Sequence, residues 1–284
     1  MRRLSHIVLF VLLIVQFSCF VRPSAHAEDI LAIDREAYQE KLEGFWLGQC
    51  IANWTGLRTE GARKQPPFLT DSDWGKRNGQ KYPGQETKQM IEFVLVPRGE
   101  VWGADDDTDI EYIYQELLVQ NQTALLNPEQ IRDGWLRHIK LEEPNYLWVS
   151  NETALHLMAK GLLPPETSLP ENNKNYLKID AQLTTEIFGL LSPTRPDFAI
   201  EMANLPIRTT AYQDSQWISE FYVAMHALVS VVDPELSSKE KMFWLADQAK
   251  SKLPEGSVPR KIYDFVLAHY LSNADKDDWE STRD

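Results

Sequence analysis

Positive charge is scarce in this chain, which has 29 lysines and arginines against 42 aspartates and glutamates and a formal net charge of −13. Binding to nucleic acid or to an anionic membrane needs a basic surface, so this balance argues against both as partners. Cysteine is also scarce, because Cys50 is the only one that follows the N-terminal leader described below. A single cysteine cannot form an intrachain disulfide, and Cys50, which lies in an apolar run, is expected to be a packed thiol.

Long apolar runs are missing except at the N-terminus. Arg2 and Arg3 precede a run from about residue 7 to residue 21, and Ala25-His26-Ala27 follows it. A basic start, a short apolar run and an A-x-A site are typical of a secretory signal peptide, with an uncleaved membrane anchor as the alternative. We therefore predict a signal peptide at residues 1–27, a single domain at 28–284, and a secreted or periplasmic protein without stable membrane association. The leader carries three arginines and no acid, so cleavage would change the net charge from −13 to −16.

Strand patterns are lacking too, because no alternation of apolar and polar residues recurs along the chain. Apolar residues at helical spacing recur instead, and the predicted architecture is all-α. A long loop is predicted at residues 57–84, and the spacing leaves 90–96 undecided between strand and helix. The predicted helices are one capped by Asp34 that ends near Gly56, one from Thr108, one opened by Asn127 and Pro128, one capped by Asn151, one opened by Pro196, and those at 217–232, 239–252 and 259–271.

The densest polar feature is an acidic stretch ahead of the second predicted helix. Asp105, Asp106, Asp107, Asp109 and Glu111 place five carboxylates within seven positions. Thr108 and Glu111 fit the S/T-x-x-E capping box, which predicts that the helix starts at Thr108. The three aspartates before it would then lie on the loop that enters the helix.

Two interpretations of these aspartates remain open from their spacing alone. Three consecutive carboxylates repel one another unless the loop is solvated or a cation lies among them. Ligands that are all oxygen suit Mg²⁺, Mn²⁺ or Ca²⁺ better than zinc. The spacing supports a metal site and a solvated acidic turn equally.

The acidic stretch resembles a known motif. Residues 103–109, Gly-Ala-Asp-Asp-Asp-Thr-Asp, are similar to the first metal motif of the ADP-ribosylglycohydrolase family, T/S-D-D-T. Residues 44–52 are similar to that family's first helix, G-x-x-x-G-[DQ]-x-[IL]-[AG], and weaker similarities lie at 179–189 and 221–225. Together these segments cover most of residues 36–233.

The resemblance implies an all-α orthogonal helical bundle with a dinuclear Mg²⁺ or Mn²⁺ centre at the bottom of a cleft for ADP-ribose. By position, Asp105 stands where the family has Thr or Ser, and Asp106 and Asp107 match its two aspartates. All three would therefore be metal ligands. The implied function is hydrolysis of the glycosidic bond of an ADP-ribosyl group, carried by a protein or by a small-molecule ADP-ribose conjugate.

The sequence departs from the family pattern at two places. Gly56 stands where the family has a glutamate that contacts the metal-bound water, and the nearest acid is Glu60, which becomes the candidate catalytic residue; the alternative is an exposed loop acid. The closing motif D-x-D-[ST] has its nearest match at residues 275–278, too close to residue 284 for the helix that follows it in the family. That spacing implies a domain lacking its C-terminal part or a defective second metal site, unless these acids are a solvated tail.

One further residue is singled out by the resemblance. Asp214 lies where the family often has a turn near the substrate, so it is the candidate substrate-binding residue; the alternative is an N-cap for the helix predicted from Trp217.

Two other classes of function compete with the hydrolase. A non-catalytic relative would bind ADP-ribose and a metal but would not activate water. A metal-independent (α/α) glycosidase would use two carboxylates, and the nine tryptophans give it mild support. Removal of metal separates the hydrolase from this glycosidase, and binding without turnover identifies the non-catalytic relative.

Overall fold

The computed structural model describes residues 32–74, 91, 99–101, 103–143 and 147–284. The signal peptide predicted at residues 1–27 lies outside them, as do the predicted loop beyond residue 74 and nearly all of the segment 90–96. The chain divides into two units, Met1–Ala37 and Tyr38–Asp284. In the first unit Asp34 Oδ1 accepts a hydrogen bond from the Ala37 amide at 2.8 Å, as expected of a helix cap.

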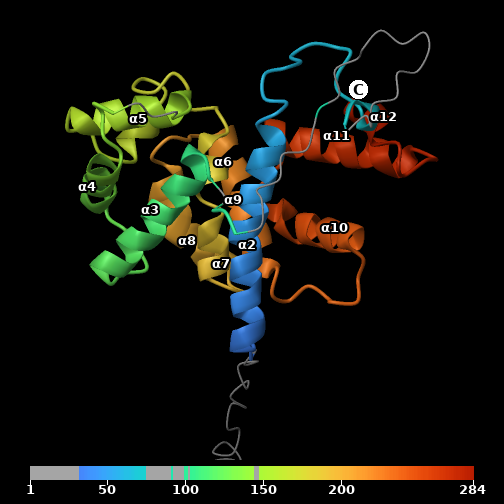
Figure 1. Ribbon diagram of the computed structural model, residues 1–284, viewed down its shortest axis with the longest axis horizontal. Helices are drawn as coiled ribbons and strands as arrows, with labels where there is room; N and C mark the ends of the chain where they lie inside the picture. Colours follow the sequence, from blue (N-terminus) through green and yellow to red (C-terminus); the bar gives the residue numbers. More distant parts are fainter. Residues whose placement is uncertain (1–31, 75–90, 92–98, 102, 144–146) are drawn as a thin grey trace, which may run out of the picture. The chain divides into compact units, whose positions relative to one another are not determined.

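The all-α architecture predicted from the sequence is confirmed (Figure 1). The described residues form helices joined by turns and no strand, with one isolated backbone bridge between Trp74 and Ile91. The helices are α2 (Arg35–Gly56), α3 (Asp106–Asn121), α4 (Pro128–His138), α5 (Val149–Ala159), α6 (Asp180–Thr184), α7 (Ile187–Leu191), α8 (Pro196–Ile207), α9 (Asp214–Leu228), α10 (Ser238–Ala249), α11 (Val258–Ser272) and α12 (Trp279–Arg283).

Most predicted helix boundaries lie within a few residues of those observed. The start of α4 is as predicted, since the Asn127 side chain accepts a hydrogen bond from the Gln130 amide at 2.8 Å and Pro128 is the first helical residue. The segment 179–191 forms the two short helices α6 and α7. They turn this part of the chain back against α9.

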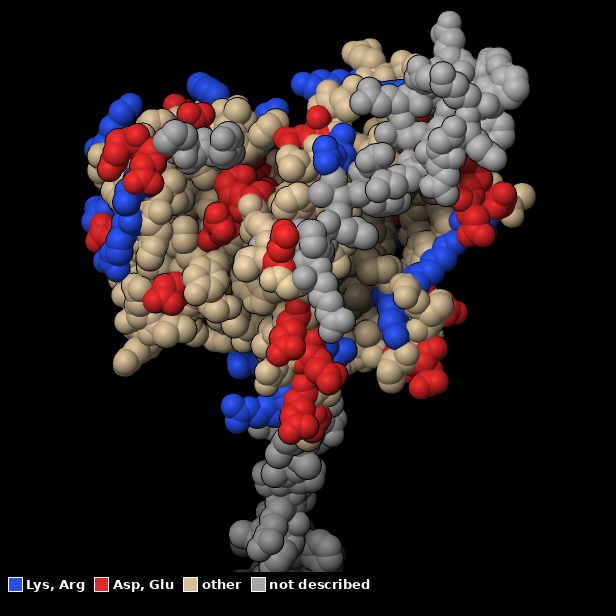
Figure 2. All heavy atoms as spheres, in the orientation of Figure 1, with Lys and Arg blue, Asp and Glu red and all other residues tan. Residues whose placement is uncertain are grey.

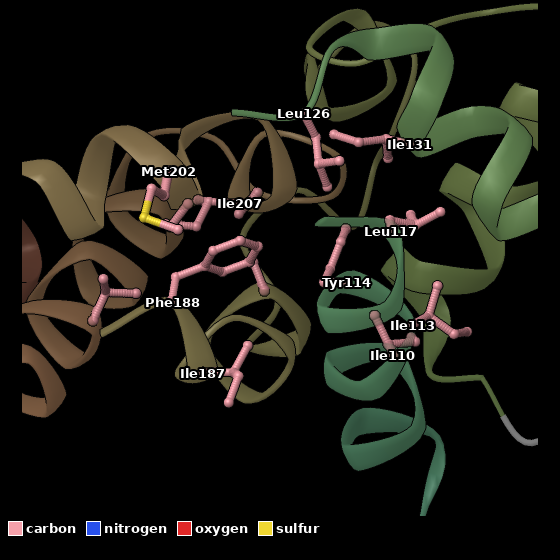
Figure 3. Packing of buried hydrophobic residues seen from close by; sticks show 14 of the residues in the cluster. Ile110, Ile113, Tyr114, Leu117, Leu126, Ile131, Ile187, Phe188, Met202 and Ile207 are labelled. Atoms are coloured by element: carbon pink, nitrogen blue, oxygen red, sulfur yellow. The ribbon is translucent and has the colours of Figure 1, made fainter. Parts of the chain in front are cut away.

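The main hydrophobic core lies among α3, α4, α5, α7, α8 and α9. Its largest side chains are fully buried, and the centroids of the Tyr114 and Phe188 rings lie 5.6 Å apart. Figure 3 shows these two rings extending toward each other from α3 and α7. The helical spacing of Ile110, Ile113, Tyr114, Leu117 and Leu118 predicts one buried face on the acidic helix. The first four are buried in this core and Leu118 is half-buried at its edge.

A glycine brings α7 directly against α9. A Cβ added to Gly189 would lie 2.4 Å from the Val223 carbonyl oxygen and 2.6 Å from the His226 Cβ. No side chain fits at that distance, so glycine lets the two helices approach closely. This contact sets the positions of Glu186, just before α7, and of His226 on α9.

A second apolar cluster joins α9 to α10 and to the turn at Lys250–Lys252, with α11 packed beside it. The outer side of α11 is exposed to solvent, and 75% of the Phe265 surface is accessible. Acidic side chains are spread over the face of the molecule that Figure 2 shows, in keeping with the net charge of −13. No helix in the described part of the chain is both long and apolar enough to span a membrane.

Candidate active site

The acidic helix starts earlier than the sequence predicted. Asp105 is the N-cap of α3, and its Oδ1 accepts hydrogen bonds from the backbone amide and the hydroxyl of Thr108, both at 3.1 Å. The prediction that the helix starts at Thr108 is therefore wrong. Aspartate is as good an N-cap as serine and better than threonine, and Asp105 holds the amide that Thr108 exposes. As a result Asp106 and Asp107 lie in the first turn of α3 and not on the loop before it.

Glu111 does not close a capping box either. It is fully buried, where it accepts a hydrogen bond from the Ile187 backbone amide at 2.8 Å and a short one from the Gln49 side-chain amide. The carboxylate therefore ties α3 to the start of α7 and to α2. Burial raises the pKa of Glu111 to about 8, against the lowering effect of the hydrogen bonds from Gln49 and Ile187.

Two carboxylates converge on the start of α5. Asp106 Oδ2 accepts a hydrogen bond from the Trp148 amide at 3.2 Å, and Asp180 Oδ1 accepts from the amides of Ser150 and Asn151 at 3.1 and 3.0 Å. These are amides that a helix start leaves without partners within the helix. Asp106 of α3 and Asp180 of α6 thus meet at the same helix end.

Asn151 was predicted to cap α5, and that prediction is wrong. The N-cap residue is Trp148, whose side chain makes no capping hydrogen bond, and Asn151 lies in the first turn of the helix. The reason is that Asp106 and Asp180, distant in sequence, take over the amides that a local cap would satisfy.

Asp107 is the most perturbed residue of the acidic stretch. Burial raises the pKa of its carboxyl to about 8, and nearby negative charges raise it further, those of Asp106, Asp105, Asp180 and Glu186. The pKa of Asp106 is also raised by burial, with smaller contributions from Asp105 and Asp180. We call Asp106, Asp107, Glu111, Asp180 and Glu186 the acidic cluster; Glu111 and Asp180 are fully buried and the other three are half-buried.

Glu186 joins this cluster through its effect on the pKa of Asp107 and of Glu111. Burial raises the pKa of its carboxyl, while the His226 side chain, whose Nε2 lies 4.0 Å from Glu186 Oε2, lowers it. The imidazole Nδ1 faces the Tyr222 carbonyl at 2.9 Å and the ring packs edge-on against Phe45, with centroids 5.6 Å apart. His226 is thus held beside an acid.

The cluster contains carboxylate oxygens without partners. Asp107 Oδ1 and Asp180 Oδ2 are buried and make no hydrogen bond to any described residue. Buried polar atoms are normally satisfied, and charged oxygen atoms that are not satisfied suit a hard cation. As they stand, however, no three His, Cys, Asp or Glu side chains within the described ranges form a group that could hold a metal ion. The donor chemistry fits a divalent ion, and binding one would require the carboxylates to move closer together.

The other two predicted site residues lie apart from these contacts. Glu60 is exposed in the turn after α2, where its backbone amide bonds to the Gly56 carbonyl at 3.0 Å. Asp214 is half-buried and is the first residue of α9, whose N-cap is Gln213, so the helix starts before Trp217 and Asp214 does not cap it. The catalytic role of Glu60 and the substrate-binding role of Asp214 stay predictions.

The C-terminal acids are on the surface. Asp275, Asp277 and Asp278 are exposed, and Asp277 Oδ1 lies 3.5 Å from the Lys239 Nζ. Asp278 caps α12 by accepting a hydrogen bond from the Ser281 amide at 3.1 Å. These contacts are those of a solvated acidic tail.

The fold and the cluster define a class of protein, an all-α domain with buried and half-buried carboxylates where α3, α5, α6 and α7 meet. A model of the family described as ADP-ribosylglycohydrolase matches residues 34–280. The chain belongs to the ADP-ribosylglycohydrolase family, as the resemblance of its acidic motif predicted, and this membership supports a glycohydrolase-like function on ADP-ribosyl groups. Comparisons with curated proteins and with solved structures give no match.

Sequence reasoning missed three members of the cluster. Asp180 and Glu186 lie inside the segment that resembles the family, but no local pattern marks either as a partner of the acidic helix. Glu111 was recognised as an acid of the stretch and assigned to a cap. A signal for its burial was present, since Glu111 follows Ile110 and precedes Ile113 and Tyr114 on the apolar face of α3.

Proposed function

We propose that this protein hydrolyses the glycosidic bond of an ADP-ribosyl group and depends on a divalent cation, Mg²⁺ or Mn²⁺, at the start of α3. The observation that carries the proposal is the position of the family's acidic motif. Asp106 and Asp107 lie in the first turn of a helix, where burial and neighbouring acids raise the pKa of both. A cation among them would relieve that repulsion.

The residues that would hold the ion are Asp105, Asp106 and Asp107. The Asp107 Oδ1 is the buried oxygen without a partner among described residues, whereas one Asp105 oxygen is engaged by Thr108 and one Asp106 oxygen by the Trp148 amide. Each of these two carboxylates keeps a second oxygen for an ion. The resemblance to the family implies a dinuclear centre, and a second ion is part of the proposal.

Cleavage of a ribosyl bond passes through an oxocarbenium-like state, which water attacks. When bound, the ion would supply positive charge that orients ribose hydroxyls and lowers the pKa of a water. Among the chain's own groups, Glu60 is the proposed base for that water and Asp214 the proposed contact to substrate. Glu111, whose pKa of about 8 keeps it mostly protonated at neutral pH, would hold α3 against α7 without adding charge.

The decisive test is cleavage of ADP-ribosylated substrates with and without metal. A panel of arginine-linked, serine-linked and acetyl-linked ADP-ribose is incubated with the full chain, first with EDTA and then with excess Mg²⁺ or Mn²⁺. The expected result is cleavage of at least one linkage that EDTA abolishes and metal restores. Cleavage that survives EDTA would identify the metal-independent glycosidase, and binding of ADP-ribose without cleavage would identify the non-catalytic relative.

We also propose that the protein acts after secretion or in a periplasm, as its leader indicates. Mass spectrometry of the protein recovered from its producing cells tests this directly. A mature N-terminus at Glu28 is expected, and an intact Met1 in the mature protein would contradict it.

A further inference from the structure

His226 is held in one orientation by neighbours on three helices. Its Nδ1 faces the Tyr222 carbonyl oxygen at 2.9 Å, and its ring packs edge-on against the Phe45 ring with centroids 5.6 Å apart. Its Cβ lies against Gly189, where an added Cβ would come within 2.6 Å of it. These contacts, from α9, α2 and α7, fix the direction in which the second ring nitrogen, Nε2, points.

The contact with Tyr222 also determines which ring nitrogen always carries a proton. A carbonyl oxygen only accepts hydrogen bonds, so the imidazole donates from Nδ1. Nε2 is then the basic nitrogen of the ring, and it lies 4.0 Å from Glu186 Oε2. That distance suits an ion pair and is too long for a direct hydrogen bond.

His226 is the basic side chain that approaches the acidic cluster. Within the part of the chain that the structure describes, no lysine or arginine nitrogen lies within 4.0 Å of a cluster carboxylate, whereas His226 Nε2 does. Its partner Glu186 raises the pKa of Asp107 and of Glu111 on α3. Glu186 also raises the pKa of Tyr222 on α9. A positive charge on His226 therefore acts among several titratable groups.

Packing alone does not explain a histidine at this position. An apolar side chain of similar size would fill the space between Phe45 and Gly189 without a polar ring. A half-buried carboxylate such as that of Glu186, in contrast, is costly unless a positive partner or hydrogen bonds compensate for the lost water. The imidazole of His226 supplies that positive partner.

We propose that His226 is a positioning residue of the proposed active site, which holds the Glu186 carboxylate in place through Nε2 while Nδ1 stays fixed on the Tyr222 carbonyl. This inference rests on the proposed function, because Glu186 belongs to the same acidic cluster as Asp106 and Asp107. It gives α9 a link to the site near the end of the helix, whereas Asp214 lies at its start.

The test uses two amide side chains that each imitate one ring nitrogen. The amide nitrogen of asparagine lies as many bonds from Cα as Nδ1 does, and that of glutamine as many as Nε2 does. H226N therefore keeps the contact with the Tyr222 carbonyl and loses the contact with Glu186, whereas H226Q does the reverse. On a cleaved ADP-ribosyl substrate, H226N should lower kcat about tenfold and change KM less than about twofold, and H226Q should retain most of the activity. H156N is the matched control, because it removes an exposed histidine that also lies 4.0 Å from a glutamate, and it should leave kcat unchanged.

A double-mutant cycle with E186Q shows whether His226 acts through Glu186. In the E186Q background, H226N should cause no further loss of kcat. An equal loss in both backgrounds overturns the inference. H226Q that is as impaired as H226N also overturns it, since that is the result expected if only packing or the Tyr222 contact matters.

Nitrogen-15 NMR of the imidazole rings in EDTA gives a readout that does not depend on cleavage. His226 should carry a proton on Nδ1, and E186Q should shift its Nε2 resonance while the resonances of His156 stay unchanged. An Nε2 resonance that E186Q leaves unchanged overturns the inference even in an active enzyme. If no linkage is cleaved and E186Q still shifts Nε2, the proposed function fails and the pairing of His226 with Glu186 stands. Circular dichroism and thermal melting verify that each variant is folded, and the NMR comparison of wild type with E186Q decides if H226N is not.

Discussion

At the start of α3 carboxylates face other carboxylates, whereas on α10, α11 and α12 they face lysines and arginines. Burial and neighbouring acids raise the pKa of Asp107 to about 8. On α11 the opposite holds, because Lys250 Nζ lies 2.7 Å and Arg260 Nε 3.0 Å from the Asp264 carboxylate and lower its pKa. An aspartate therefore has a raised pKa among half-buried acids in one region and a lowered pKa in a surface ion pair in the other.

This difference shows why a dense run of acids does not by itself identify a site. Residues 275–278 match the spacing of a family motif as closely as any other part of the C-terminal segment, yet they are solvated and Asp277 faces a lysine. What distinguishes Asp107 is a half-buried position near acids from other segments, Asp180 of α6 and Glu186 just before α7. This repulsion among acids from separate segments is what supports the proposal of a cation at the start of α3.

The largest expected difference between the two regions is in packing. Phe188 is fully buried against Tyr114 behind the acidic cluster, while Phe265 on α11 is 75% exposed. Phe188→Ala should lower the free energy of unfolding by about 3–5 kcal/mol, the usual cost of a cavity left by a buried phenylalanine. Phe265→Ala should change it by less than about 0.5 kcal/mol. Urea denaturation measures both, and similar losses for the two variants would contradict the core described here.

The second comparison concerns activity on an ADP-ribosylated substrate. Asp107→Asn keeps the shape of the side chain and removes the charge proposed to hold the ion, so kcat/KM should fall about 100-fold or more, equivalent to about 2.7 kcal/mol. Asp277→Asn removes an exposed charge and should change kcat/KM less than about twofold. A large loss in Asp277→Asn with normal stability would show that the C-terminal acids belong to the site after all.

Before any variant is made, the sequence already predicts much of this comparison. The helical spacing of Ile110, Ile113, Tyr114 and Leu117 predicts the buried face of α3, because local periodicity is a direct consequence of packing one side of a helix. The family of the chain also follows from the acidic motif. These features depend on residues close together along the chain.

The parts that sequence reasoning missed are contacts between distant segments. The start of α3 was misplaced because a good local capping box at Thr108 and Glu111 competed with Asp105, and only the tertiary hydrogen bond from Ile187 shows that Glu111 is needed elsewhere. Asp180 reaches α5 from 29 residues away, and no local pattern encodes that distance. Burial of a carboxyl group also depends on tertiary structure, and it determines which acids have a raised pKa.

A third comparison uses pH. A carboxyl whose pKa is higher in the folded protein than in the unfolded chain keeps its proton while the unfolded chain releases it, so the free energy of unfolding falls as pH rises. For Glu111 this fall occurs between the ordinary value of 4.5 and about 8. In EDTA, Glu111→Gln removes that titration and should gain on the order of 3 kcal/mol relative to the wild type between pH 5 and pH 8.

Urea denaturation of the wild type and of Glu111→Gln at pH 5 and pH 8 gives the change in the free energy of unfolding for each protein. Subtracting one change from the other removes the contributions of the other titrating groups. An equal change in the wild type and in Glu111→Gln would mean that Glu111 does not carry a raised pKa.

The smallest expected effect is at the surface pair of α11. The lowered pKa of Asp264 stabilises the fold above its ordinary value of 3.8, and that contribution is lost as pH falls through the folded value, which is the opposite sign to Glu111. The pair is exposed, so salt screens it. Asp264→Asn should lower the Tm slightly in dilute buffer and not at all in 0.5 M NaCl, with cleavage activity unchanged. If Asp264→Asn lowers the Tm equally in high salt, Asp264 stabilises the fold through packing of its Lys250 and Arg260 partners. The difference between the two regions would then lie in side-chain contacts and not in charge.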